Sequence, residues 1–147
     1  MRGATRGIRR AALAGVAAAG LALVPAVADA TPAAGVTGRI ISQHTVGGKD
    51  YILREITIAP GGKTGWHFHD GTLYAFVAQG TLTHSDSSCQ TDGIYRTGAA
   101  FTEPSGANHV HIGRNLGKKA VVLDVLYVLP AGAPLSEDAP NPGCDFE

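Results

Sequence analysis

The chain has 147 residues, a formal net charge of zero and 44% hydrophobic residues, a composition typical of globular proteins. Beyond residue 30 its lysines and arginines are dispersed, so no basic patch indicates nucleic-acid binding. It also lacks a G-x-S-x-G elbow, a phosphate-cradling glycine loop and an H-E-x-x-H helix, which leaves serine hydrolase, nucleotide-binding and zincin functions without local support.

Residues 1–30 have the pattern of a signal peptide. Four arginines precede an uncharged apolar run over residues 11–24, and residues 28–30 (A-D-A) offer a cleavage site before Thr31. We expect bacterial export, which would make the protein secreted or extracytoplasmic, and no membrane span once the leader is removed. Arg9 and Arg10 leave Sec and twin-arginine export both open. Four arginines and one aspartate give the leader a charge of +3, so the remainder carries about −3.

Residues 31–147 suffice for one domain with its own core. We expect a flexible lead-in over 31–38, an all-β domain over 39–130 and a Pro-rich tail over 131–147. Many short strands with regular turn signals indicate a sandwich or barrel. The predicted strands cover residues 39–46, 51–59, 65–69, 73–78, 81–85, 93–95, 100–102, 110–112 and 120–129.

Two histidine pairs stand out along these strands. His67 and His69 follow the turn signal P-G-G, and His109 and His111 follow P-S-G some forty residues later. Strand side chains alternate, so the two histidines of an H-x-H pair point the same way. Two such pairs on separate strands can meet only if the sheet closes on itself.

The two cysteines lie in different segments, Cys89 in a polar loop and Cys144 in the tail. An exported protein meets an oxidising compartment, where paired cysteines normally form a disulfide. We expect a Cys89–Cys144 bond that fastens the tail against the loop. Two free thiols are the alternative.

These segments resemble the cupins. The first cupin motif, G-x5-H-x-H-x3,4-E-x6-G, is matched by Gly61, His67, His69 and Gly80. The second, G-x5-P-x-G-x2-H-x3-N, is similar to the stretch Gly98, Pro104, Gly106, His111 and Asn115, with two extra residues before the histidine. The resemblance spans about residues 39–130 and implies a single-domain cupin-type jelly-roll β-barrel.

The resemblance carries over His67, His69 and His111 as metal ligands, with His109 as an alternate ligand or a partner of the ligands. The glutamate of the first motif is missing, because Leu73 or Tyr74 stands in its place. The ion would be a divalent transition metal (Fe, Mn, Ni or Zn). Loss of the glutamate leaves the alternative that the metal was lost with it.

Two functions stay open. One is a metal-dependent, dioxygenase-like enzyme acting on a small molecule, and the other is a non-catalytic module that binds a small ligand or a metal. Catalytic residues cannot be named from the sequence. Cupins often pair through strand edges, so a homodimer is also an expectation.

Five further residues have simpler interpretations. Trp66 should pack outside the barrel, and His44 and His84 should be surface groups. Glu103 should end its strand in solvent, with a general base at the barrel mouth as the alternative. Asp124 interrupts an apolar strand, which predicts a partner of the site or a paired charge in the core.

Overall fold

The computed structural model describes residues 30–146, so the predicted signal peptide lies almost wholly outside the described residues. Within residues 30–146 the chain forms ten strands and no helix, so this part of the chain contains no helix that could cross a membrane. The strands are β1 (Ala34–Val46), β2 (Lys49–Lys63), β3 (His67–Phe68), β4 (Thr72–Gln79), β5 (Thr81–Asp86), β6 (Thr91–Arg96), β7 (Ala100–Glu103), β8 (His111–Arg114), β9 (Val121–Pro130) and β10 (Glu137–Asp138).

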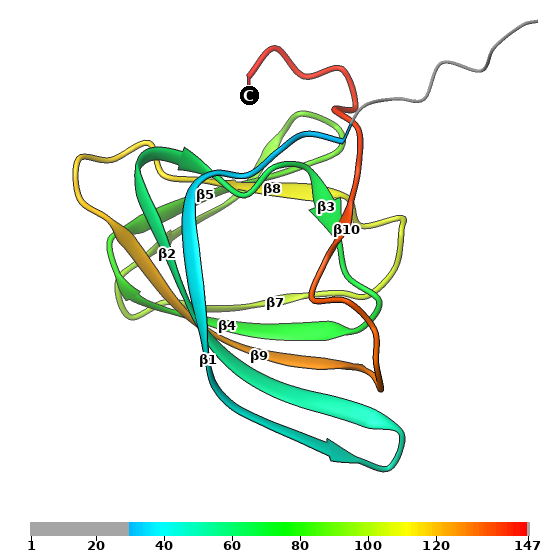
Figure 1. The fold of residues 1–147 in the computed structure, drawn as a ribbon. Helices are drawn as coiled ribbons and strands as arrows, with labels where there is room; N and C mark the ends of the chain where they lie inside the picture. The colour runs from blue at the N-terminus through cyan, green and yellow to red at the C-terminus, as the bar shows by residue number, and fades with distance from the viewer. Residues whose placement is uncertain (1–29, 147) are drawn as a thin grey trace, which may run out of the picture.

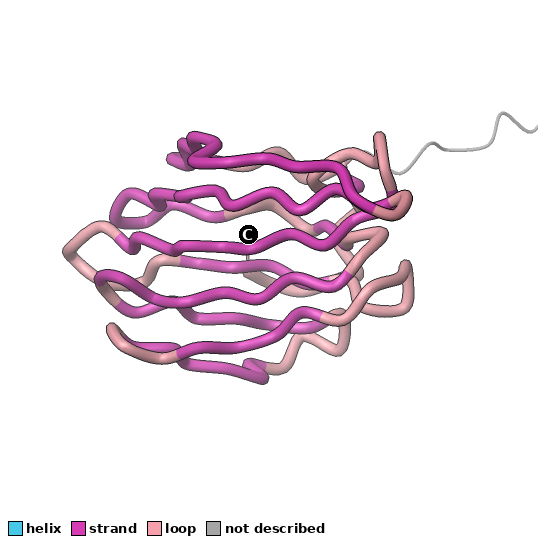
Figure 2. The backbone as a smooth tube through the Cα atoms, turned by 90° about the horizontal axis from the view of Figure 1, so that it is seen from below, coloured by secondary structure: helices cyan, strands magenta, loops and turns pink. Residues whose placement is uncertain are grey.

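The strands curl into a nearly closed antiparallel barrel (Figures 1 and 2). One wall has the order β1-β2-β9-β4-β7, and the other has the order β6-β5-β8-β3-β10. The walls meet where Lys63 at the end of β2 pairs with Arg114 at the end of β8. The prediction of an all-β barrel is therefore confirmed.

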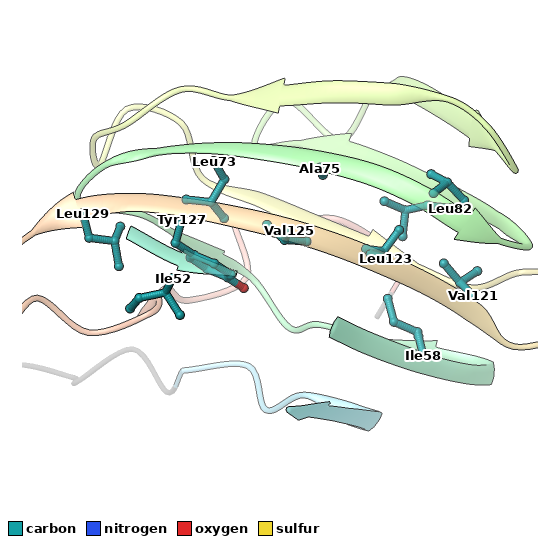
Figure 3. Close-up of a cluster of buried hydrophobic side chains, with 11 residues drawn as sticks. Ile52, Ile58, Leu73, Ala75, Leu82, Val121, Leu123, Val125, Tyr127 and Leu129 are labelled. Carbon is teal, nitrogen blue, oxygen red and sulfur yellow. The ribbon is translucent and has the colours of Figure 1, made fainter. Parts of the chain in front are cut away.

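The hydrophobic core lies between the two walls, and β9 shows how the sequence builds it. Val121, Leu123, Val125, Tyr127 and Leu129 alternate along this strand, and all five are at most 5% exposed (Figure 3). Burying each such side chain contributes about 1.5–3 kcal/mol. The residues between them face outward.

Asp124 is one of these outward residues, so the prediction that it serves the site or the core was wrong. It is only half-buried, and its strand neighbours in register are Glu55 on β2 and Phe76 on β4. Alternation from the buried Leu123 and Val125 dictates this placement. On the outer surface, the hydrogen bond and charge of Glu55 raise the pKa of Arg39, and the charge of Asp124 adds a smaller effect.

Strand β1 begins at Ala34, within the segment expected to be a flexible lead-in. It pairs with β2 from Val46↔Lys49 to Ala34↔Lys63, with two irregularities in the register. The pairing is made because β2 runs on through the P-G-G turn signal to Lys63. β1 pairs only with β2 and so forms the edge of this wall, and most of its residues are exposed.

The C-terminal tail folds back across the other wall. β10 pairs with β3, and the Ala139 amide donates to the Trp66 carbonyl at 2.9 Å. The predicted disulfide between Cys89 and Cys144 is present. Trp66 faces away from the barrel interior and is fully buried with Ile112 and the tail, in a second apolar cluster.

Candidate metal centre

Three histidine rings meet at one end of the barrel interior. His67 begins β3, His69 follows it, and His111 begins β8, where it lies opposite His67 in register. Their ring centroids are 4.3–5.3 Å apart, and one nitrogen from each ring lies within 4.8 Å of the others. The structure thus brings together the residues that the sequence predicts as ligands.

Each ring is oriented by a hydrogen bond from its Nδ1. His67 donates to the Gly65 carbonyl at 2.9 Å, and His69 donates to the Leu135 carbonyl at 2.7 Å. His111 donates to the backbone carbonyl of His109 at 2.8 Å. A proton on Nδ1 leaves the lone pair on Nε2, the arrangement of most metal-binding histidines. The Nε2 atoms of His69 and His111 are buried and lack an aligned hydrogen-bond partner among the described residues.

Glu103 points into this group of histidines, so the prediction of a solvated strand end was wrong. Its side chain is 12% exposed, and Oε2 lies 3.1 Å from His69 Nε2 and 3.3 Å from His111 Nε2. Glu103 shares the inner face of β7 with Phe101, whose ring lines the same cavity. That alternation was the available sequence signal.

His84 was also predicted wrongly, because it is 3% exposed rather than a surface group. Its Nδ1 donates to Asp92 across the β5–β6 hairpin, and its Nε2 lies 3.6 Å from Glu103 Oε1, too long for a hydrogen bond. With His109 and His111 it forms a second group whose ring nitrogens could hold a metal. His44, in contrast, is exposed on β1 as predicted.

A small cavity of about 50 Å³ adjoins the rings. By volume this is room for a few waters or for the reacting end of a small molecule. Apart from the three histidines and Glu103 its lining is mostly apolar, with contributions from Leu73, Leu82, Phe101 and Val125 among others.

Comparison with family models matches residues 54–129 to the cupin domain. The chain belongs to the cupin family. A comparison with curated proteins gave no match.

Three solved structures illustrate how widely this cupin fold is shared. The polyketide cyclase RemF from Streptomyces resistomycificus has a TM-score of 0.60 at 20% identity, covering 76% of this cupin and 79% of RemF. A cupin domain from Bordetella pertussis has a TM-score of 0.54 at 20% identity, covering 67% and 95%. A cupin-2 domain from Rhodospirillum rubrum has a TM-score of 0.57 at 16% identity, covering 72% and 66%.

This cupin carries a carboxylate on a different strand from the one its motif predicts. Leu73 is buried on β4 at the position where the motif has glutamate, and Glu103 on β7 is its register partner. Facing residues on adjacent antiparallel strands have Cβ atoms about 4.5–5.5 Å apart, so a carboxylate at either place reaches the same interior space.

The charges of this cluster depend on one another. Burial raises the pKa of Glu103, but the contacts and charges of His111 and His69 outweigh it and hold that pKa well below its usual range. Burial lowers the pKa of His111, and its contact with Glu103 more than offsets this. Burial and the neighbouring imidazoles lower the pKa of His67 to about 3. Without a metal, His67 is therefore neutral at pH 7.

Proposed function

We propose that this cupin is an exported protein that binds one divalent transition metal through His67, His69 and His111 and presents it to a small molecule. The observation that carries the proposal is the convergence of three ring nitrogens within 4.8 Å, with each Nδ1 already bonded to a backbone carbonyl. Rings fixed in this way lose little freedom when a metal binds. Imidazole nitrogens suit Fe, Ni or Zn, and a carboxylate ligand would also suit Mn.

Glu103 is a suitable fourth ligand. Its oxygen lies 3.1–3.3 Å from two ring nitrogens, close to the separation of neighbouring ligands around an ion with bonds of about 2.1 Å. Such a metal would supply Lewis-acid or redox activation of a bound molecule. The surrounding apolar residues exclude bulk water, and the Glu103 carboxylate can accept a hydrogen bond from a ligand in the cavity.

Two uses of the centre remain, and the inward carboxylate favours a metal-dependent enzyme, whether dioxygenase-like or of another reaction type. RemF is a polyketide cyclase on a similar fold, which is consistent with enzymatic chemistry in such a barrel. A non-catalytic module that binds a metal or a small ligand is the alternative. Retained metal without turnover of any small molecule would favour it.

The deciding experiment is elemental analysis of protein purified from its native exporter without a histidine tag. We expect about one metal per chain, lost in His67→Ala and retained in the matched control His44→Ala, which removes an exposed histidine. A metal-free native protein, or metal retained by His67→Ala, would contradict the proposal.

Export and assembly are parts of the same proposal. The leader pattern and the Cys89–Cys144 disulfide support an extracytoplasmic location. Exposed Ile40, Ile41 and Val46 on β1 favour the expected homodimer. N-terminal sequencing of the exported protein would test the first, and light scattering in solution the second.

A further inference from the structure

A second functional feature is an arginine that faces inward. Arg54 lies on β2 between Ile52 and Ile56, both of which turn toward the core, and Arg54 is itself only half-exposed. Its register partners are Ile40 on β1 and Val125 on β9, both apolar. A cation on the inner side of a barrel wall is costly unless an anion accompanies it.

No such anion is supplied by the described part of the chain. Within residues 30–146, no carboxylate oxygen forms an ion pair with Arg54. The nearby Arg39, on the outer surface, donates hydrogen bonds from two guanidinium nitrogens, Nε and Nη2, to the Glu55 carboxylate at 2.9 and 3.0 Å. The Arg54 guanidinium instead lies over Gly38 of β1, where a Cβ atom would come within 2.3 Å of it. β1 thus accommodates the arginine by having no side chain there.

The guanidinium lines a cavity of about 260 Å³ at the barrel mouth. His67, His69 and Tyr127 line this cavity as well as the inner one, so the two spaces adjoin. Burial raises the pKa of Tyr127, and the neighbouring Arg54 opposes that shift. A neutral phenol and a guanidinium together offer several donors and no negative charge.

We propose that Arg54 binds the carboxylate of a small organic acid whose other end extends toward His67 and His69. A guanidinium fork matches a carboxylate in two parallel hydrogen bonds, and the cavity volume limits the body of the ligand to a few carbons or one ring. The contact of the far end with a metal rests on the proposed function, whereas the carboxylate contact does not.

The test is calorimetric titration of the full protein with acetate, butyrate and benzoate, using benzamide as the neutral isostere of benzoate. Each titration is run on metal-loaded protein and on chelator-treated protein. We expect at least one carboxylate to bind, and benzoate to bind about tenfold or more tightly than benzamide. Arg54→Gln should lower the affinity for the carboxylate that binds by about tenfold or more. Arg39→Gln, which removes the outer arginine, should leave it unchanged within about twofold.

Thermal melting establishes whether each variant is folded. If Arg54→Gln does not fold, Arg54→Lys takes its place in the titrations. The lysine keeps the charge but loses the fork, so an intermediate affinity is expected. The inference is overturned if no carboxylate binds, if benzamide binds as well as benzoate, or if the Arg54 variant binds as tightly as wild type. Arg54-dependent binding in a protein that takes up no metal would remove the metal proposal and leave this one standing.

Discussion

At the scale of single residues, the site depends on which nitrogen of each imidazole carries the proton. Gly65, Leu135 and His109 supply backbone carbonyls that hold the proton on Nδ1 of the three candidate ligands. Backbone acceptors are fixed by the fold, so a substitution of their side chains need not disturb them. The Nε2 atoms are consequently oriented toward the cavity before any ion arrives.

Moving the carboxylate between the facing positions 73 and 103 tests whether it completes the centre. Glu103→Leu should weaken metal binding by about 10–100-fold, because one ligand or its charge is lost. Adding Leu73→Glu to that variant returns a carboxylate from the facing strand and should recover part of the affinity. Competition with a chromophoric chelator measures both.

Glu55→Gln, on the outer surface, is the matched control for loss of a carboxylate. If Glu103→Leu binds metal as tightly as wild type, Glu103 is not a ligand.

The neutral His67 gives a pH prediction for the metal-free protein. Its pKa is about 3 when folded and about 6.5 when unfolded. Between those values the unfolded state binds more protons, so stability falls as the pH falls. His67→Gln removes this term, and the loss of stability between pH 6.5 and 4 should shrink by on the order of 2–3 kcal/mol.

Urea titrations at several pH values measure the effect, with His44→Gln as the exposed control. The raised pKa of His111 acts in a different window, since its contribution is present below pH 6.5 and is lost as the pH rises through the folded value. An unchanged slope in His67→Gln would show that His67 is not buried as a neutral ring.

The H-x-H spacing is a local pattern that singles out two histidine pairs, and the resemblance to the cupin motifs selects His67, His69 and His111 from them. Glu103 and His84 were missed because their inward direction depends on how β7 and β5 register against other strands. The alternation of Ile52 and Ile56 predicts that Arg54 faces inward, but arginine is usually exposed, so its residue type predicts the opposite. Chain pattern alone could not reveal the space that Gly38 leaves for it.

At the scale of elements, β9 contributes five side chains to the hydrophobic core, with one face buried and the other turned outward. Leu129→Ala should lower the free energy of unfolding by about 2–4 kcal/mol, because it leaves a cavity in the packed interior. Leu126→Ala, on the opposite and half-buried face, should cost less than about 1.5 kcal/mol. Equal losses in urea denaturation would contradict the assigned faces.

At the scale of the whole molecule, the disulfide joins the tail to the wall that carries the histidines. Leu135 in the tail orients His69, and Asp138 of β10 pairs with His67. Cys89→Ser with Cys144→Ser should lower the free energy of unfolding by about 3–4 kcal/mol for a loop of 55 residues.

The same double variant should also bind metal more weakly, since a loosened tail no longer fixes the His69 ring. Isothermal titration with zinc measures this, and the matched single control is Ser88→Ala in the neighbouring loop. Unchanged metal affinity in a destabilised variant would show that the tail does not orient His69 for metal binding.

The pairing of β10 with β3 has a consequence for how the site is assembled. Residues 67–69 are brought to their final orientation by a segment almost seventy positions further along the chain. The central pairing of β2 with β9 joins residues just as far apart, so closing the barrel and orienting the histidines cost comparable loop entropy. The hydrophobic core offsets that cost without any of the three histidines, so stripping an ion should leave the barrel folded.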